Sequence, residues 1–447
     1  MAEKVMVIGG GLAGSLISIF MAKRGYDVHV YERRPDPRSA NVYQGKSINL
    51  ALSNRGLNAL KKVGLDEAIL KTAIPMSGRM MHSTNGELSY QPYGKEGQAI
   101  NSVSRGGLNI RLLELADEFE NIHLNFNARC VDVNLDEGTA IYENPKGEKN
   151  TVAADRIIGT DGAFAATRLR LQFTELFNYR QDYLDHGYKE LHIPPDATNG
   201  FRLEKNALHI WPREEFMMIA LPNIDGSFTC TLFLAQKGNP SFETLDTKDK
   251  VEQFFKRYFP DTLPLIPDLL KDFLENPTGS LVTVRCYPWV YKDKLALLGD
   301  AAHAIVPFYG QGMNCAFEDC VVLDQCLEKY SNNWSQALDE YQKLRKPNAD
   351  AIANLALQNF VEMRDKVADK DFLHRKHIEH ELTELYPDIF KSQYELVTFS
   401  LEPYDYALRR GEVNNRLLDE IIGRKLDAEL TNAGIMIPLI MKYQLPN

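Results

Sequence analysis

The chain has 447 residues, 44% of them hydrophobic, so it is long enough for two or three structural units of about 100–200 residues each. It carries 51 Lys and Arg against 61 Asp and Glu, a formal net charge of −10, and no basic run. This balance disfavours a nucleic-acid partner.

The first residues, MAEKVMVIGG, lack the charged and apolar regions of a signal peptide, and we expect a cytoplasmic protein.

The N-terminal region predicts a β-α-β unit. Residues 4–8 form a short apolar strand, residues 15–24 a helix that stops at Gly25, and residues 27–32 a second strand of alternating polarity.

The glycines after the first strand form a G-x-G-x-x-G motif. They allow a tight turn, the approach of a pyrophosphate to helix amides, and close packing of helix on strand. Glu32, at the end of the second strand, suits a ribose diol and would repel a 2′-phosphate, which favours FAD or NAD over NADP here. Arg33 either lines the adenine side or is solvated. The expected cofactor contacts are Gly9, Gly11, Leu12, Ala13, Gly14, Glu32 and Arg33.

Two later apolar segments, residues 157–160 and 295–298, each run into a Gly/Asp turn. They predict two more buried strands of the same sheet. The nucleotide-binding domain is therefore expected to be discontinuous, formed by residues 1–72, 101–178 and 279–330.

A β-rich region separates these stretches. Residues 208–211, 216–221 and 227–234 predict strands, with turns at Pro212 and at residues 223–226. We expect them to form an antiparallel sheet inserted into the first domain.

From Trp334 on, the pattern is helical, with breaks expected at Pro347, Pro387 and Pro403. The predicted fold class is α/β: a Rossmann-like FAD-binding domain, an inserted antiparallel β-sheet substrate domain and a helical C-terminal region. The last two are expected over residues 73–100 and 179–278, and over residues 331–447.

The positions of the cysteines favour reduced thiols over disulfides, and those of the histidines do not indicate a metal site. The six cysteines contain no C-x-x-C pair, and Cys315, Cys320 and Cys326 fall on one helix predicted to be buried. Three histidines between residues 374 and 380 lack the accompanying ligands of a zinc site. The apolar tail, residues 434–441, is too short to span a bilayer, but a weak membrane contact is left open.

Two aspartates follow the later strands, Asp161 in IIGTDG and Asp300 in LLGDAAH. Asp300 stands where a strand ends and can accept hydrogen bonds from the hydroxyls of a ribitol chain. Gly310 and Gly312 let the backbone approach a flat ring. A helix that begins near Met313 would point free amides at a flavin and stabilise negative charge on it. The flavin contacts expected from this segment are Gly312, Met313 and Asn314.

These glycine, DG and GD elements resemble those of single-component flavin-dependent aromatic hydroxylases, over the first three-quarters of the chain. The resemblance implies that Asp161 and Asp300 contact noncovalent FAD. It implies the same for Arg105 in SVSRGGLN, which is otherwise a surface arginine at a helix start. Ala165 departs from the family, which usually has serine there, and this weakens the expected contact with the pyridine nucleotide. Only one G-x-G-x-x-G occurs, so NADPH is expected as a transient co-substrate.

Further segments resemble the branch of this family that hydroxylates L-kynurenine, over nearly the whole chain. By that resemblance, Arg79 and Tyr93 bind the substrate carboxylate. A guanidinium offers a planar fork that matches a carboxylate, and a phenol adds a neutral donor. Asn359 contacts the amino-acid or ring portion, and Pro307 and Phe308 lie against the reactive face of the flavin. The segments are ERRPDPR, GKSINLALSNRG, QPYG, HGYKEL, NALHIWPR, VPFYGQGMNCAFED and NFVEM.

The same resemblance extends to residues for which a structural role is an equal alternative. Glu362 and Met363 would share a helix face with Asn359, but Met363 also suits a core and Glu362 also suits the solvent. Tyr394 either closes over the site or is a packed tyrosine. An apolar wall, or else a sheet core, is expected from Leu208, Ile219, Leu221 and Phe233.

The implied reaction is that NADPH reduces FAD, that O₂ forms a flavin C4a-hydroperoxide, and that oxygen passes to ring C3 of L-kynurenine. The product would be 3-hydroxy-L-kynurenine, a step of tryptophan catabolism. Three alternatives remain: hydroxylation of another anthranilate-like or phenolic acid, an oxidase or reductase without oxygen insertion, and a nonenzymatic dinucleotide sensor. The oligomeric state is not readable from the sequence.

Overall fold

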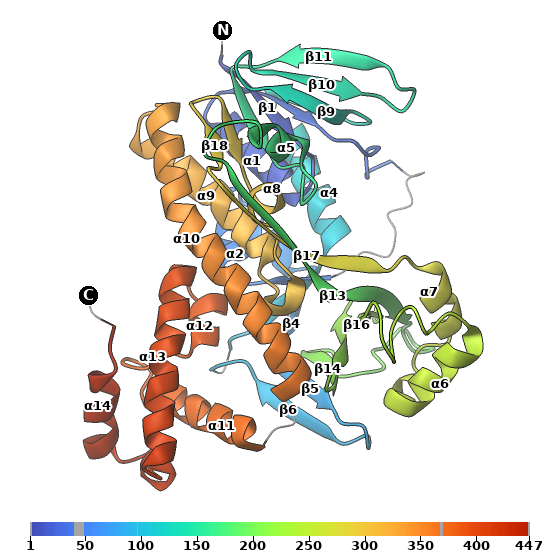
Figure 1. The fold of residues 1–447 in the computed structure, drawn as a ribbon, viewed down its shortest axis with the longest axis vertical. Coiled ribbons are helices and arrows are strands. Elements are labelled where there is room, and N and C mark those ends of the chain that lie inside the picture. The colour runs from blue at the N-terminus through green and yellow to red at the C-terminus, as the bar shows by residue number, and fades with distance from the viewer. Residues whose placement is uncertain (1, 40–48, 96, 367–369, 446–447) are drawn as a thin grey trace. The chain divides into compact units, whose positions relative to one another are not determined.

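The computed structural model of the chain describes residues 2–39, 49–95, 97–366 and 370–445 (Figure 1). Residues 45–48, part of the GKSINLALSNRG segment, lie outside the described residues. The chain forms two compact units, and our three-domain boundaries stay a prediction. The first unit contains Met1–Lys71, Val103–Tyr183 and Val282–Ala353; the second contains Thr72–Ser102, Leu184–Leu281 and Asn354–Asn447.

A mostly parallel sheet organises the first unit, with its six strands in the order β18-β19-β12-β1-β2-β8. At its centre, β1 (Lys4–Ile8) pairs in parallel with β2 (Asp27–Tyr31) on one side and β12 (Arg156–Gly159) on the other. β19 (Leu295–Leu297) continues the parallel pairing beside β12. The four predicted strands are confirmed, with ends that differ by one residue at most.

The helix that links β1 to β2, α1 (Leu12–Lys23), begins three residues earlier than predicted. Gly11 is its N-cap in an extended conformation, and the Ser15 N–H donates to the Gly11 carbonyl at 2.8 Å. The glycine motif thus forms the first helical turn itself, because the motif works by presenting helix amides. Gly25, with φ +86°, follows the helix end and confirms the predicted stop.

The first unit has further elements: β8 and β18 are the edge strands of this sheet, and β9, β10 and β11 form a separate antiparallel sheet (Figure 1). They are β3 (Asn49–Leu52), α2 (Asn54–Lys62), α3 (Asp66–Leu70), α4 (Arg105–Asp117), β8 (Ile122–Asn125), β9 (Arg129–Asn134), β10 (Thr139–Glu143), β11 (Lys149–Ala153), α5 (Ala166–Leu171), β18 (Val290–Tyr291), α8 (Asp300–His303), η2 (Pro307–Tyr309) and α9 (Gly312–Lys329).

The second unit is built on a mixed sheet in the order β17-β13-β16-β15-β14-β5-β6. Its antiparallel centre confirms the three predicted strands as β14 (Ala207–Arg213), β15 (Phe216–Pro222) and β16 (Phe228–Ala235). β5 (Gly78–His82), however, pairs with β14 in parallel, so the sheet is not wholly antiparallel.

The turn predicted at Pro212 is wrong. Pro212 lies inside β14, opposite Met217, and the chain turns at Glu214, which has φ +57°. The pairing of β14 with β5 ends at Ile210. Proline is therefore tolerated at this point, because one side of the strand needs no N–H donor there. The turn predicted at residues 223–226 is confirmed by a bond from the Gly226 N–H to the Asn223 carbonyl at 3.0 Å.

The remaining elements belong to the second unit or cross the boundary between the units. They are β4 (Ile74–Met76), β6 (Leu88–Pro92), β7 (Ile100–Ser104), β13 (Asn178–Ile193), α6 (Lys248–Tyr258), η1 (Pro260–Thr262), α7 (Leu269–Glu275), β17 (Gly279–Tyr287), α10 (Trp334–Val361), η3 (Glu362–Lys366), α11 (Lys370–Leu385), α12 (Gln393–Thr398), α13 (Tyr404–Gly423), η4 (Asp427–Glu429) and α14 (Ala433–Lys442).

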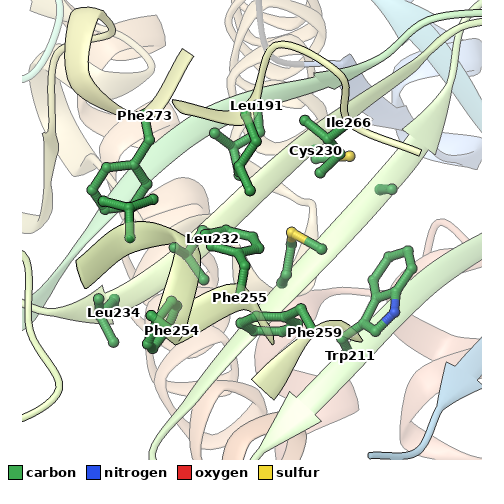
Figure 2. Packing of buried hydrophobic residues seen from close by; sticks show 14 of the residues in the cluster. Leu191, Trp211, Cys230, Leu232, Leu234, Phe254, Phe255, Phe259, Ile266 and Phe273 are labelled. Carbon is green, nitrogen blue, oxygen red and sulfur yellow. The ribbon is translucent and has the colours of Figure 1, made fainter. Parts of the chain in front are cut away.

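One face of the second unit's sheet carries an aromatic-rich core. Figure 2 shows side chains of the strands, among them Leu191, Trp211 and Leu232, directed toward Phe255 and Phe273 of the covering helices α6 and α7. Alternate strand residues point to opposite faces, so this core uses only one of the two faces. Residues on the other face of the sheet, such as Leu208, do not belong to this core.

The break predicted at Pro347 is wrong, because α10 runs through this proline without interruption. Proline in a helix interior costs about 3 kcal/mol. Burial of neighbouring side chains such as Ala349 and Ile352 offsets that cost. The breaks predicted at Pro387 and Pro403 are confirmed, since α11 ends at Leu385 and Pro403 caps α13.

The C-terminal helices α11, α13 and α14 lie near one another (Figure 1) and share a second apolar cluster. In it, Leu382, Leu417 and Ile440 are fully buried. In α14, Met436 and Leu439 face this cluster, whereas 42% of Ile437 and 53% of Met441 are exposed. Among the described residues, no helix has the length and apolar character needed to cross a membrane.

Candidate active site

The glycine motif packs so closely that two of its positions admit only glycine. A Cβ on Gly9, where φ is +105°, would lie 2.5 Å from the Thr160 carbonyl oxygen. A Cβ on Gly14 would lie 1.8 Å from the Gly9 carbonyl oxygen. Within the described residues, a Cβ on Gly11 would meet nothing within 4 Å, and Gly11, the N-cap of α1, has no side chain that could cap the helix. The uncapped amides of this turn fit a pyrophosphate, since they and the helix dipole attract an anion.

Glu32 joins the end of the second strand to this loop. Its Oε2 accepts from the Gly10 N–H at 2.8 Å, and its Oε1 accepts from the Arg34 N–H at 2.9 Å. A carboxylate has about four acceptor sites, so Glu32 keeps capacity for ribose hydroxyls. Arg33 is exposed, and its proposed place on the adenine side stays a prediction.

Asp161 lies beside Gly9 and caps α5. Its Oδ1 accepts from the Thr167 hydroxyl at 2.6 Å, and its Oδ2 accepts from the Thr167 N–H at 3.1 Å. Burial raises the pKa of Asp161, although these bonds oppose the shift. Ala165 occupies the N-cap position and offers no side-chain bond. The departure from the family at this position thus leaves Asp161 to supply the cap.

The turn that carries Asp300 lies against two helix starts. Gly299, with φ +59°, would place a Cβ 3.1 Å from Ala316 of α9 and 3.5 Å from Ala13 of α1. Asp300 is the first residue of α8 and is exposed. The fold therefore gathers the glycine, DG and GD elements, which are far apart in the sequence, at the carboxyl ends of parallel strands.

The start of α9 at Gly312 confirms the helix predicted near residue 313, and the side chain of its N-cap residue, Gln311, forms no capping hydrogen bond. Asn314 is fully buried there. Its Nδ2 donates to the Ala51 carbonyl at 2.8 Å, and its Oδ1 accepts from the Ser53 N–H at 3.0 Å. These bonds fix the helix start to β3 and α2, while contact of Met313 and Asn314 with a flavin stays a prediction.

Pro307 and Phe308 lie in the 3-10 turn η2, directly before α9. Gly310 closes this turn with φ +66°, and its N–H donates to the Pro307 carbonyl at 2.9 Å. A Cβ at Gly310 would meet the Ala51 Cβ at 2.9 Å, so the close approach needs glycine. Phe308 is buried and Pro307 is exposed.

Arg105 is the first residue of α4 and is exposed. One turn later, the Asn109 Nδ2 donates to the Gly10 carbonyl at 3.3 Å. Residues four apart share a helix face, so the face that carries Arg105 is directed toward the glycine loop. Asn109 closes the SVSRGGLN segment but was not among the predicted site residues.

In the second unit, Arg79 of β5 lies against two tyrosine rings. Its guanidinium carbon is 5.3 Å from the ring centre of Tyr93 and 5.1 Å from that of Tyr394. The two rings stack 5.2 Å apart. Burial raises the pKa of Tyr93, and the charge of Arg79 opposes the shift. The phenol is therefore a neutral donor beside a cation, which together suit a carboxylate.

The four predicted wall residues share the sheet face of Arg79. Leu208 stands directly opposite Arg79 in the parallel register of β14 and β5. The registers of β14 with β15 and of β15 with β16 place the other three on this same face. None of the four belongs to the core under α6 and α7, which favours a wall over a core role. They are Leu208, Ile219, Leu221 and Phe233.

Asn359, Glu362 and Met363 lie where α10 passes into the short π-helical segment η3. Asn359 is buried, and its Nδ2 lies 3.3 Å from the sulfur of Met363, so these two side chains meet as the helical spacing predicted. η3 packs against β14 and β15. π-helical turns are frequent at functional sites, because they redirect side chains within a helix.

The expected cofactor contacts all belong to the first unit, as do Pro307 and Phe308. The other expected substrate contacts all belong to the second unit.

Of the three C-terminal histidines, His374 is exposed and lies 3.0 Å from Asp427. Two other groups within the described residues hold metal-type ligand atoms within 4.8 Å of one another, which the sequence argument did not anticipate. They are Asp27, His29 and His123, and His303, Cys315 and Asp319.

Residues 2–356 match a family described as FAD binding domain. The chain is 48% identical over 422 residues to kynurenine 3-monooxygenase of Flavobacterium psychrophilum, with 94% of each chain covered. The enzyme of the same name from Myxococcus xanthus is 49% identical, with 97% of this chain and 95% of the relative covered. The enzyme of the same name from Dictyostelium discoideum is 46% identical, with 99% of this chain and 98% of the relative covered.

Solved structures of flavin oxygenases share the fold. The tetrameric form of 2-methyl-3-hydroxypyridine-5-carboxylic acid oxygenase superposes with a TM-score of 0.67 at 21% identity, covering 83% of this chain and 95% of the other. p-Nitrophenol 4-monooxygenase from Pseudomonas putida superposes with a TM-score of 0.65 at 19% identity, covering 83% and 91%. At these identities the likeness concerns the fold, and it confirms the predicted fold class.

Proposed function

Because the chain belongs to the kynurenine 3-monooxygenase family of FAD-dependent enzymes, we propose that it hydroxylates L-kynurenine at ring C3, using NADPH and O₂. The structural observation that carries the proposal is the guanidinium of Arg79 beside the rings of Tyr93 and Tyr394. A cation flanked by phenols is suited to anchor the carboxylate of an aromatic amino acid.

Bound FAD would supply the redox chemistry, passing electrons from NADPH to O₂. The residues of the first unit fit this cofactor. The uncapped start of α1 would hold the pyrophosphate, and Glu32 and Asp300 would accept hydrogen bonds from ribose and ribitol hydroxyls. The uncapped start of α9 would stabilise negative charge on the flavin ring, because free amides and the positive end of the dipole meet there.

The second unit would bind and orient the substrate. Arg79 pairs with the carboxylate, and Tyr93 donates a hydrogen bond without adding charge, since its pKa is raised by burial. Asn359 would orient the amino-acid or ring portion, and the apolar face beside Arg79 would exclude water. The ortho amino group of kynurenine makes its ring electron-rich, so no protein base is needed to activate it.

Arg79→Ala tests the anchor. Loss of a charge-assisted pair costs about 1.5–3 kcal/mol, so we expect KM for kynurenine to rise roughly 10- to 150-fold. Arg257→Ala is the matched control, because Arg257 also lies over a tyrosine ring, 5.0 Å from that of Tyr258, but is exposed on α6. An Arg79 variant with the KM of the control would remove Arg79 from the substrate site.

Oxygen insertion is tested by turnover under ¹⁸O₂ followed by mass analysis of the product. We expect one labelled oxygen in hydroxylated kynurenine and faster NADPH oxidation when kynurenine is present. Unlabelled kynurenine with hydrogen peroxide as the only product would favour an oxidase. Hydroxylation of phenolic acids in place of kynurenine would favour the alternative substrate class.

We also propose a cytoplasmic location with at most a weak membrane contact. All six cysteines are free, and five are buried, as suits a reducing compartment. The exposed Ile437 and Met441 of α14 are the side chains available for a lipid surface. Flotation with anionic phospholipid vesicles tests the contact. We expect a small fraction of the wild-type protein to float with the vesicles, and none of the Met441→Lys variant.

A further inference from the structure

Beneath the GD turn, the first unit holds five charged side chains from four helices, of which four are buried and Glu318 is partly buried. They alternate in sign and form one connected network, which none of the motifs above predicts. Two arginines and a histidine face two carboxylates. The five are Arg55 of α2, His303 of α8, Glu318 and Asp319 of α9, and Arg345 of α10.

Asp319 is the centre of the network and is fully buried. Its Oδ2 accepts from the Gly299 N–H at 2.9 Å and from the His303 Nε2 at 2.6 Å. Its Oδ1 accepts from the Arg345 Nε at 2.7 Å. One carboxylate on α9 therefore holds both ends of the GDAAH segment, the glycine before Asp300 and the histidine after it.

The network continues from Arg345 across the back of α9. Arg345 donates to Glu318 and to the Cys315 carbonyl, and Glu318 also accepts from Arg55. Buried charges are stable only when they are paired and hydrogen-bonded, and each of these carboxylates has two cationic partners. Separating these helices would therefore remove at least one partner from a charge in the network.

His303 is held as a cation by this surrounding. Burial would lower its pKa, but the adjacent Asp319 carboxylate outweighs burial, and the pKa of His303 is raised well above its ordinary value. The groups that face it are Asp319 and Cys315 of α9, with the Trp289 ring 5.1 Å away. In this protonated form the ring can donate from both nitrogens, with Nε2 bonded to Asp319.

A metal ion is the competing occupant, because His303, Cys315 and Asp319 hold ligand atoms within 4.8 Å of one another. Arg345 already supplies the cation that such a cluster needs. Its guanidinium contacts Asp319 at 2.7 Å and the Cys315 sulfur at 3.3 Å. A divalent ion here would lie against a buried guanidinium, a repulsion that disfavours it.

We propose that His303 is a positioning residue for the flavin: through Asp319 it fixes the Asp300 turn to α9, whose uncapped N-terminus is assigned to the flavin ring. Asp319 lies about two turns along α9 from Gly312, so the network sets the distance between the two flavin-binding elements. The proposal rests on FAD as the cofactor but is independent of which aromatic substrate is hydroxylated.

The test measures FAD binding to apoprotein of two variants. His303→Leu removes the donor to Asp319, whereas His303→Gln keeps a donor in the place of Nε2. We expect the Kd for FAD to rise about 10- to 100-fold in the leucine variant, the range found when residues that orient metal ligands are removed, and to stay within about 3-fold in the glutamine variant. The visible spectrum of the remaining bound flavin should shift only in the leucine variant.

His209→Leu is the matched control. His209 is a buried histidine of the second unit, so this change should lower stability without altering the Kd for FAD. Wild-type FAD affinity in His303→Leu, or equal losses in its leucine and glutamine variants, would overturn the proposal. Should His303→Leu not fold, Asp319→Asn replaces it with the same expected loss, and wild-type affinity there overturns the proposal as well. Failure to hydroxylate kynurenine with the expected FAD affinities would count against the proposed substrate alone.

Discussion

The two units bury histidine in opposite electrostatic settings. His303 of the first unit touches the Asp319 carboxylate, and its pKa is raised well above the ordinary value. His209 of the second unit lies between His82, at 2.9 Å, and the Glu204 carbonyl, at 2.8 Å, and burial lowers its pKa to about 4. Burial alone thus keeps an imidazole neutral, and one buried carboxylate reverses the outcome.

The contrast has opposite consequences for stability. His303 stabilises the fold fully below the unfolded pKa of about 6.5, and this contribution is lost as the pH rises through its higher folded pKa. For His209 the sign is reversed. The unfolded chain binds a proton that the folded chain does not, so stability falls as the pH drops from about 6.5 toward 4.

Arg345→Met should have the largest effect, because it leaves Glu318 and Asp319 short of a cationic partner in the interior. We expect the free energy of unfolding to fall by about 3–5 kcal/mol, measured by urea denaturation. Arg409→Met is the control, since Arg409 and Asp405 form an exposed pair on α13 and contribute at most about 0.5 kcal/mol. Equal stability of the two variants would show that the buried network is not stabilising as a unit.

The pH dependence attributed to His209 comes next in size. Between pH 7 and pH 5 it should cost the wild type about 2 kcal/mol of unfolding free energy, because the unfolded chain gains a proton in this range. His209→Gln cannot titrate, so its urea midpoint should change less over the same interval. A wild-type slope that the variant reproduces would assign the acid sensitivity to other groups.

Ala165→Ser should stabilise the first unit modestly. Ala165 occupies the N-cap of α5 with extended backbone angles, φ −64° and ψ 127°, which suit a capping serine. We expect a gain of about 1 kcal/mol at most, measured as a higher melting temperature. Ala166→Ser, one residue inside the helix, serves as the control and should bring no gain. A loss at residue 165 would mean that the cap supplied by Asp161 leaves no room for a second one.

The smallest effect is expected at a partly exposed ion pair of the second unit. The Lys95 Nζ lies 3.6 Å from the Glu395 Oε1, next in sequence to Tyr394, and Lys95 itself follows the Tyr93 segment. A double-mutant cycle of Lys95→Met and Glu395→Gln should give a coupling of about 0.5–1 kcal/mol in the KM for kynurenine. Additive effects would show that the pair does not help to hold Tyr93 against Tyr394.

Much of the fold was predictable because the signals are local. The central strands of both sheets, such as β1 and β15, follow from runs of apolar residues, and Gly25 ends α1 as its position after the helix predicts. The outer strands, among them β13 and β17, were not predicted. The errors have tertiary causes. Pro347 stays inside α10 because buried neighbours offset its cost, and Pro212 stays inside β14 because the pairing with β5 has already ended.

In the candidate site, too, some residues were predictable from the sequence and others depend on tertiary packing. Arg79 and Tyr93 were expected to act together from the family resemblance, whereas Tyr394 was left open between a site residue and a packed tyrosine. The structure places the rings of both tyrosines against the Arg79 guanidinium. The charged network could not be predicted. Asp319 ends the VPFYGQGMNCAFED segment, but Arg345 lies 26 residues further on and outside the family segments, so only the packing of α9 against α10 makes them partners.

By itself, the sequence determined an FAD-binding α/β protein related to kynurenine 3-monooxygenases, and the relatives confirm this, because glycine spacings and family segments are properties of contiguous residues. Only the tertiary structure decided which sheet face is core and which carries Arg79. It also decided that His303 is held as a cation and His209 as a neutral ring. The reason is that strand register, burial and the pairing of charges depend on residues that are distant in sequence and adjacent in space.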